Sequence, residues 1–340
     1  MASITDVAAL AGVSAATVSR ALSGNGHVSA ATRGKVVEAA ETLGYVASSS
    51  ASSLASGRTR NVGVVVPFVD RWYFSAVIEG AQRALMERGY DLTLYTLRED
   101  GAARASVFEQ FLLRKRVDAV IAVSLELTEA EVQRLHALHK PLVGIGGPLT
   151  GVRTLTIDNP AVARLCTEHL LALGHTRIAF AGGSLDEDGA FDLNLSRRQG
   201  FAQAMHGAGI DVPDEDYRSA EYSIDTGYVA AKQLLGRPHG RPTAIVAGSD
   251  EVAIGCILAA KDLGMSVPRD VSITGIDDHE LAAFFDLTTV AQFPQRQGAL
   301  AVELLMDDLH PDAADADAAP RSTALPFELV VRGSTARPAP

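Results

Sequence analysis

The sequence has few cysteines and no long uncharged apolar run, and these absences exclude several classes of protein. Its two cysteines, Cys166 and Cys256, lie far apart in stretches of helical apolar periodicity, without CxxC or Cys/His ligand spacing. We therefore expect buried reduced thiols and not a disulfide, redox pair or metal site. No segment approaches the ~20 apolar residues of a membrane span, and the N-terminus lacks the features of a secretory signal. These absences predict a cytoplasmic protein.

Sequence motifs of the common enzyme and cofactor sites are also missing. The chain contains no GxSxG, P-loop or HExxH motif. It also lacks the GxGxxG fingerprint that a dinucleotide site needs after its first strand. The acidic stretch at residues 186–189 has the wrong spacing for an EF-hand calcium loop. We therefore predict neither enzymatic activity, nor a cofactor, nor a bound metal.

Positive charge is scarce overall but is concentrated near the N-terminus. The chain carries 30 basic and 41 acidic side chains, for a net charge of −11. Residues 1–60 hold five basic and three acidic side chains, which gives +2 there and leaves −13 for the remainder. Only local charge meets a phosphate backbone, so a mildly basic segment on an acidic body is compatible with a DNA-binding tip.

The first 45 residues have the pattern of three short helices. Ser3 and Asp6 form a capping-box pattern that opens a helix through residue 10, and Gly12 ends it. Ser14 is expected to cap a second helix over 15–22. A third helix over 30–43 begins after Ser29 and is stopped by Gly44. On this third helix, the expected buried face consists of Val36, Val37, Ala40 and Leu43. A helix, a tight glycine turn, a second helix and a supporting helix make a helix-turn-helix plan.

The remainder of the chain alternates between strand and helix patterns, after a linker rich in serine and alanine at residues 46–57. Five short apolar runs predict strands at 62–66, 92–95, 119–123, 142–145 and 155–157. Five more follow at 177–181, 219–222, 244–247, 272–275 and 289–291. Helices are expected between them, for example over 75–88 and 104–113. Two such series predict an α/β fold of two lobes, each a doubly wound parallel sheet, with ligands in the crevice at the strand carboxyl ends. The acidic tail at 312–320 is expected to be an exposed loop.

The chain resembles the LacI/GalR family of transcriptional regulators along nearly its whole length. The segments that carry this resemblance, in chain order, are ITDVAALAGVSAATVSRAL (4–22), VSAATR (28–33), LGY (43–45), LLALGHTRI (170–178), VPRDVS (267–272), GIDD (275–278), LTTV (287–290) and ELVVRGS (328–334). The resemblance implies a helix-turn-helix DNA-binding head (1–45), a hinge (46–58) and a two-lobed, periplasmic-binding-protein-like domain for effector binding and dimerisation (59–340).

The second helix of the head is the expected recognition helix. A helix that enters the major groove meets base edges with its N-terminal residues, which places Ala15, Ala16 and Arg20 there. Arg20 can fork onto a guanine. The other expected DNA contacts are short polar side chains suited to phosphates: Thr5, Ser14, Thr17, Ser19, Asn25, His27, Ser29 and Thr32. The alternative is that these serines and threonines only cap helices.

The linker has a second interpretation through the resemblance. In the family this segment folds into a hinge helix on operator DNA and a leucine enters the minor groove. Leu54 matches the leucine and Ala51 its small neighbour. Ala47 and Ser48 replace the usual proline and asparagine, and basic residues common on the hinge are absent, so operator preference is expected to differ. A plain serine-rich linker is the alternative.

The resemblance also assigns effector-binding positions on both lobes. They are Asp70, Arg71, Tyr73 and Phe74 in the first lobe, and Arg197, Tyr222, Ser249 and Asp277 in the second. An arginine fork and a carboxylate suit vicinal hydroxyls, and aromatic faces suit a sugar ring. Core packing is the alternative for Tyr73 and Phe74, and a strand-end turn is the alternative for Asp277. Ser249 stands where asparagine is usual, and residues 70–74 depart from the common run, so the ligand is expected to be unusual.

Together these features predict a homodimeric, ligand-responsive regulator. We expect a repressor of sugar-utilisation genes that binds pseudo-palindromic DNA and is released by a sugar. A corepressor-type regulator with a purine or phosphosugar ligand is one alternative. A solute-binding protein without a regulatory role is another, and the intact head argues against it.

Overall fold

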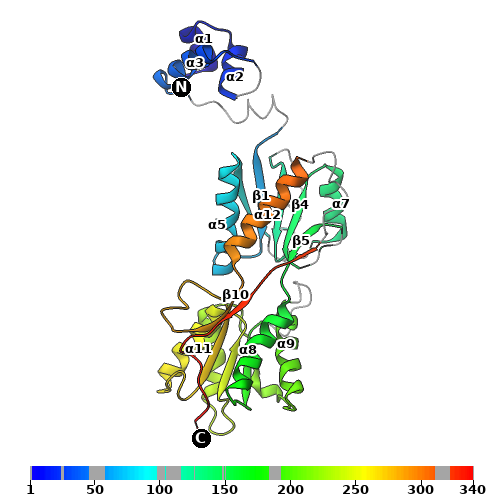
Figure 1. The fold of residues 1–340 in the computed structure, drawn as a ribbon, viewed down its shortest axis with the longest axis vertical. Helices are drawn as coiled ribbons and strands as arrows, with labels where there is room; N and C mark the ends of the chain where they lie inside the picture. Colours follow the sequence, from blue (N-terminus) through cyan, green and yellow to red (C-terminus); the bar gives the residue numbers. More distant parts are fainter. Residues whose placement is uncertain are drawn as a thin grey trace. The chain divides into compact units, whose positions relative to one another are not determined.

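The computed structural model describes residues 2–23, 27–45, 58–97, 104, 116–125, 127–147, 149, 151–183, 193–310 and 322–339. They divide into a small helical head and a large α/β body (Figure 1). Residues 46–57 of the predicted hinge (46–58), the acidic tail at 312–320 and most of the helix predicted over 104–113 lie outside these residues.

Three helices form the head, as the sequence predicts. They are α1 (Ile4–Ala11), α2 (Ala15–Ser23) and α3 (Ala30–Thr42). The capping box of α1 is present, because the Asp6 backbone N–H donates to the Ser3 hydroxyl and the Asp6 carboxylate accepts from the Ser3 backbone N–H at 2.8 Å. Gly12 ends α1 in the left-handed region at φ 66°, where glycine meets no Cβ penalty.

The core of the head lies where the three helices meet. Val7, Val18 and Val36 are fully buried, one from each helix. The face predicted for α3 is partly wrong, since Val37 is 39% exposed and Leu43 is 36% exposed. The buried positions on α3 are Val36, Ala39 and Ala40. Their i, i+3, i+4 spacing makes a narrow buried stripe along α3. The predicted buried face was wider than this stripe, because it included Val37 and Leu43.

The first lobe of the body is a six-stranded sheet in the order β11-β5-β4-β3-β1-β2. Its strands are β1 (Asn61–Val66), β2 (Asp91–Thr96), β3 (Ala119–Val123), β4 (Leu142–Gly146), β5 (Arg153–Thr156) and β11 (Ser322–Ala324). Its helices include α5 (Trp72–Glu87), α7 (Glu129–Ala137) and α12 (Pro294–Leu309). β3 and β4 are buried almost throughout, as expected of central strands covered on both faces.

The second lobe is a six-stranded sheet in the order β12-β10-β9-β8-β6-β7. Its strands are β6 (Ile178–Ala181), β7 (Tyr217–Arg218), β8 (Ala244–Ala247), β9 (Ser272–Asp277), β10 (Thr288–Ala291) and β12 (Glu328–Val330). Its helices include α8 (Asn159–Ala172), α9 (Leu193–Gly207), α10 (Ile224–Leu235) and α11 (Asp250–Asp262). β6, β8, β9 and β10 pair in parallel, and β12 pairs antiparallel to β10.

Nine of the ten predicted strands coincide with observed strands, and the differences lie at the sheet edges. The strand predicted over 219–222 is wrong, because β7 occupies Tyr217–Arg218 instead. β11 and β12 were not predicted. The chain also returns to the first lobe after β10, so that α12 and β11 complete the first sheet and β12 then joins the second. Alternating apolar runs predict strands but not the sheet to which each strand belongs.

Both cysteines are buried free thiols, as predicted. Burial raises the pKa of the Cys166 thiol and of the Cys256 thiol to about 12. Neither is therefore ionised near neutral pH, which excludes them as nucleophiles.

Helices α5 and α12 lie side by side in the first lobe (Figure 1) and approach closely at two glycines. A Cβ on Gly298 would lie 2.0 Å from the Val77 carbonyl oxygen, and a Cβ on Gly80 would lie 1.9 Å from the Gln295 carbonyl oxygen. This close approach brings Gln297 of α12 to Tyr73 of α5, whose hydroxyl donates to Gln297 Oε1 at 2.8 Å.

Gly298→Ala should therefore destabilise the body, because its methyl group would meet backbone and not a movable side chain. We expect a loss of about 1–3 kcal/mol in the free energy of unfolding, measured by urea denaturation. Gly207→Ala is the matched control, since Gly207 is also a helix residue and nothing lies within 4 Å of a Cβ there. Equal stability of Gly298→Ala and wild type would contradict the close packing.

His175 connects the C-terminal segment to the second lobe through hydrogen bonds. Its Nδ1 lies 2.8 Å from Thr243 Oγ1, and its Nε2 lies 2.9 Å from the Ala336 carbonyl oxygen and 3.1 Å from Ser272 Oγ. Burial lowers the pKa of His175, partly offset by the hydrogen bond to Ala336.

His175 should contribute a loss of stability as the pH falls below about 6.5, the ordinary pKa of histidine, because the unfolded chain then binds a proton that buried His175 resists. His169 and His279 act in the same direction, whereas Asp250, whose pKa burial raises to about 7, acts in the opposite direction. The His175 contribution is therefore measured as a difference: the free energy of unfolding is determined at pH 7.5 and 5.5 for wild type and for His175→Gln. The change from pH 7.5 to 5.5 should be less unfavourable in the variant. An identical change in the two proteins would show that His175 does not contribute.

Candidate functional site

The N-terminal end of α2 is the exposed surface of the head that the sequence assigns to DNA. Ser14 Oγ accepts from the Thr17 backbone N–H at 3.2 Å, so the predicted cap is confirmed. Ala16 and Arg20 are exposed, whereas Ala15 is half-buried against the head core. The Arg20 Nε–H donates to the Ala16 carbonyl oxygen at 3.2 Å, which uses one of the five guanidinium N–H groups.

The other short polar residues of the head also serve local structure. Ser29 Oγ accepts from the Thr32 backbone N–H at 3.2 Å and caps α3. Thr5 Oγ1 lies 2.7 Å from Ser3 Oγ at the start of α1, and His27 is exposed before α3. Capping and phosphate binding are compatible, because the free N–H groups and the dipole of a helix N-terminus favour anions. Phosphate contact stays a prediction for this set, Ser19 included, while Asn25, Ala51 and Leu54 lie outside the described residues.

Four of the predicted effector residues act on one another electrostatically in the body. They are Tyr73 of α5, Arg197 of α9, Tyr222 before α10, and Asp277 at the end of β9. Arg197 and Asp277 are 4% and 7% exposed, which is unusual for charged side chains and calls for partners. The fold therefore brings together four of the predicted effector residues, which lie far apart in the chain.

Fixed acceptors and donors hold the two buried charges. The Arg197 Nε–H donates to Asn159 Oδ1 at 3.1 Å, and its Nη1 donates to the Gly248 carbonyl oxygen. The Arg197 guanidinium carbon lies 6.0 Å from the centre of the Tyr222 ring. The Asp277 carboxylate accepts from Gln292 Nε2. The site is thus preorganised, because each charged group is oriented by a neighbour that does not itself titrate.

Burial dominates the ionisation of these residues. It raises the pKa of Asp277 well above its ordinary value, an effect that nearby Arg197 opposes and Asp250 reinforces. Burial raises the pKa of the Tyr222 hydroxyl to about 12 and that of Tyr73 further. Both phenols therefore keep their proton at neutral pH and act as hydrogen-bond donors, as the Tyr73 hydroxyl does to Gln297 Oε1. A guanidinium, a carboxyl group and two phenols form a set suited to a polyhydroxylated ligand.

The remaining predicted effector residues have other partners. Asp70 is largely exposed and pairs with Arg71 at 3.3 Å. The Arg71 guanidinium also lies 5.7 Å from the centre of the Phe68 ring. Phe74 packs against the first-lobe core and edge-on to Tyr73, with ring centres 5.4 Å apart, as the packing alternative predicted. The Ser249 hydroxyl accepts from the Val252 N–H at 3.3 Å and caps α11.

Sequence reasoning missed the residues that connect the two lobes around this set. Trp72, the only tryptophan of the chain, stacks on His279 with ring centres 4.7 Å apart. Asn159 and Gln292, which orient the two charged side chains, were also missed. Trp72 lies within the unusual run at 70–74, and that departure from the family pattern was the signal that could have found it.

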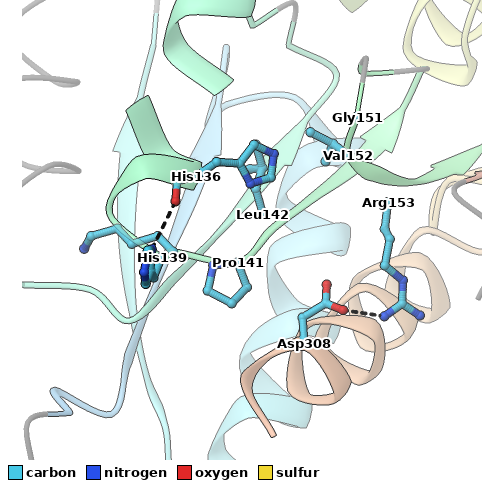
Figure 2. A pocket seen from close by; sticks show the side chains of 9 residues that line it. His136, His139, Pro141, Leu142, Gly151, Val152, Arg153 and Asp308 are labelled. Atoms are coloured by element: carbon cyan, nitrogen blue, oxygen red, sulfur yellow. Dashed lines mark hydrogen bonds and ion pairs between the residues drawn. The ribbon is translucent and has the colours of Figure 1, made fainter. Parts of the chain in front are cut away.

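Two cavities lie elsewhere in the body. One of about 250 Å³ lies in the first lobe and is lined by residues that include His136, His139, Lys140 and Arg153 (Figure 2). Figure 2 shows Arg153 directed to Asp308 of α12, at 2.7 Å. The other, of about 390 Å³, lies in the second lobe beside Arg177. Neither of these two cavities is lined by a predicted effector residue.

No helix among the described residues is both long and apolar enough to cross a bilayer. Within the same part of the chain, no three His, Cys, Asp or Glu side chains are grouped so that they could hold a metal ion.

Replacing Arg197 by methionine should destabilise the body by about 3 kcal/mol, because the buried Asp277 loses the cation that opposes its desolvation. Adding Asp277→Asn to this variant should recover part of the loss, since no uncompensated carboxylate remains. Urea denaturation of the two single variants and the double variant measures the coupling. Strict additivity of the two changes would show that the two charges do not interact.

Comparisons with known proteins agree with this architecture. Residues 3–48 match the family of bacterial regulatory proteins called the lacI family, and residues 167–335 match a periplasmic binding protein-like domain. The chain is 33% identical to the ribose operon repressor of Escherichia coli (strain K12) over 311 residues, which is 90% of this chain and 92% of the relative.

Two further relatives are similar over most of the chain. The HTH-type transcriptional repressor PurR of Vibrio vulnificus (strain CMCP6) is 33% identical over 318 residues, covering 90% of this chain and 92% of that protein. The structure of the lac repressor dimer bound to operator and the anti-inducer ONPF superposes with a TM-score of 0.81 at 26% identity. It covers 98% of this chain and 99% of that chain.

These similarities extend over the head and both lobes, so they cover the DNA-binding and ligand-binding parts together. A bacterial regulator that binds operator DNA acts in the cytoplasm, which confirms the expected location. The chain belongs to the lacI family: it is a ligand-responsive, DNA-binding transcriptional regulator with a helix-turn-helix head and a periplasmic-binding-protein-like body, and not an enzyme.

Proposed function

We propose that this protein is a homodimeric repressor of sugar-utilisation genes and that a sugar releases it from its operator. The observation that carries the proposal is the meeting of buried Arg197 and Asp277 with the phenols of Tyr73 and Tyr222. A guanidinium and a carboxyl group bind neighbouring hydroxyls, and phenol rings offer apolar faces to a sugar ring. The ribose operon repressor, at 33% identity, supports a sugar as the effector class.

The division of the chain follows the same reasoning. Residues 1–45 bind DNA, residues 46–58 serve as the hinge, and residues 59–340 bind the effector and dimerise. The lac repressor relative is a dimer on its operator. A twofold dimer presents two heads to two half-sites, so the operator of this protein is expected to be pseudo-palindromic.

A purine-type corepressor is the second candidate, and the similarity to PurR favours it. Stacked aromatic rings bind purines as well as sugars. The two candidates differ in sign, because a corepressor strengthens operator binding and an inducer weakens it. A phosphosugar corepressor would in addition need a positively charged side chain that binds its phosphate.

A ligand screen by thermal unfolding separates these candidates. The panel holds ribose, other monosaccharides, disaccharides, phosphosugars and purines. A ligand at ~100 times its dissociation constant adds ~2.7 kcal/mol of stability, which is readily measured. Stabilisation by a sugar supports the proposal, stabilisation by a purine or phosphosugar alone supports the alternative, and stabilisation by none would contradict both.

Replacing Arg20 by alanine should weaken binding to the selected operator by about 5- to 150-fold, the range of a bidentate contact to one base. The effector affinity of the variant should equal that of wild type, because Arg20 belongs to the head. Fluorescence anisotropy with labelled operator DNA measures the first quantity and thermal unfolding with the effector the second.

Arg83→Ala is the matched control, because Arg83 is an exposed arginine of the body, paired with Glu79 at 2.8 Å. It should bind operator DNA like wild type. Loss of effector affinity in Arg20→Ala, or equal loss of operator affinity in the two variants, would contradict the proposed division between head and body.

A further inference from the structure

Asp250 is a buried carboxylate outside the predicted effector set. It is the first residue of α11 and has no exposed surface. Its Oδ2 accepts from the His279 backbone N–H at 2.8 Å, and its Oδ1 accepts from Thr289 Oγ1 at 2.5 Å. One carboxylate therefore ties the start of α11 to the segment after β9 and to β10.

The segment that Asp250 holds is a turn in an unfavourable conformation. Asp277 and Asp278 have φ values of 128° and 54°, in the region that non-glycine residues rarely adopt. Such residues persist only where surrounding contacts hold them. Asp278 supplies two more contacts, through its backbone N–H to Thr289 Oγ1 at 3.3 Å and its carboxylate to Arg332 at 2.7 Å.

The two ends of this turn, Asp277 and His279, lie next to different groups of residues. At one end, Asp277 belongs to the predicted effector set. At the other, the His279 ring stacks on Trp72, which begins α5 in the first lobe, and its Nδ1 accepts from the Leu281 N–H at 2.9 Å. The next residue of α5 is Tyr73, also of the effector set. The turn thus links the effector residues to a contact between the lobes.

Packing around Asp250 leaves its carboxylate little freedom. A Cβ on Gly275 of β9 would lie 2.0 Å from Asp250 Oδ1, so the carboxylate lies directly against the strand that leads into the turn. Burial raises the pKa of Asp250 to about 7. A neutral side chain would carry a smaller desolvation cost at this place, which argues for a role beyond filling space.

We propose that Asp250 is a positioning residue of the effector site: it fixes the turn 277–279 and thereby both the presentation of Asp277 to the effector and the stacking of His279 on Trp72. The first consequence rests on the proposed function, because it requires that Asp277 binds the effector. The second requires only the contacts described above.

The test uses Trp72 as an internal reporter in the full-length protein, without ligand, at pH 8, above the raised pKa of Asp250. Asp250→Asn replaces one acceptor oxygen by an amide N–H₂ that faces a donor. We expect the acrylamide quenching constant of Trp72 to rise by about twofold or more, because a single aromatic contact is weak enough to open when its support is lost. Thr289→Val, close in shape, removes one donor and should give a smaller rise.

Asp262→Asn is the matched control. Asp262 is the last residue of the same helix, is exposed, and accepts hydrogen bonds from Tyr228 and Lys232, with no hydrogen bond to the turn 277–279. Its quenching constant should equal that of wild type. A lower unfolding temperature of Asp250→Asn without any change in Trp72 quenching would overturn the proposal and leave Asp250 a purely structural role. If Asp250→Asn does not fold, Thr289→Val takes its place in the test. An unchanged quenching constant of Trp72 in Thr289→Val would then overturn the proposal in the same way.

Binding of ribose separates this proposal from the proposed function. If ribose stabilises the wild type, Asp250→Asn should raise its apparent dissociation constant by about tenfold, as loss of a supporting residue does at other preorganised sites. An unchanged dissociation constant would overturn the link to Asp277. If ribose fails to stabilise the wild type, ribose is excluded as the effector, whereas the Trp72 comparison still decides whether Asp250 holds the turn.

Discussion

The body of this protein depends on keeping a guanidinium and a carboxyl group buried at the same place. Arg197 is held by Asn159 and the Gly248 carbonyl, and Asp277 by Gln292, so neither charge is free to turn outward. Desolvation makes this arrangement costly, and the hydrogen bonds from these neighbours offset part of that cost. In the proposed function, these preoriented groups bind the hydroxyls of the effector without losing much side-chain entropy.

A mechanism for ligand response follows from where these groups come from in the chain. Tyr73 belongs to a first-lobe helix, whereas Arg197, Tyr222 and Asp277 belong to the second lobe. A ligand that contacts both lobes stabilises one arrangement of them over others, and it can shift that equilibrium only by its difference in affinity for the two arrangements. The Trp72–His279 stack adds a contact that any relative movement of the lobes would alter.

Local patterns in the sequence predicted the head and most of the strands, because caps and apolar periodicity act within a few residues. Ser3, Ser14 and Ser29 cap the helices as predicted, and Gly12 ends α1. The return of α12 to the first lobe could not be predicted in this way, since it depends on close packing at Gly80 and Gly298. The site was predicted through family resemblance, which named Arg197 and Asp277 but not their partners Asn159 and Gln292. Those partners are recognised only by geometry.

Reciprocal coupling between effector and operator tests the central claim most directly. The operator is first selected from random duplexes, and the affinity of the full-length protein for it is measured with and without the sugar that stabilises the protein in the thermal-unfolding screen. The affinity for that sugar is then measured with and without the operator. We predict that the sugar weakens DNA binding and that DNA weakens sugar binding by the same factor. An operator affinity unchanged by a sugar that binds the body would contradict the claim that the protein is a sugar-released repressor.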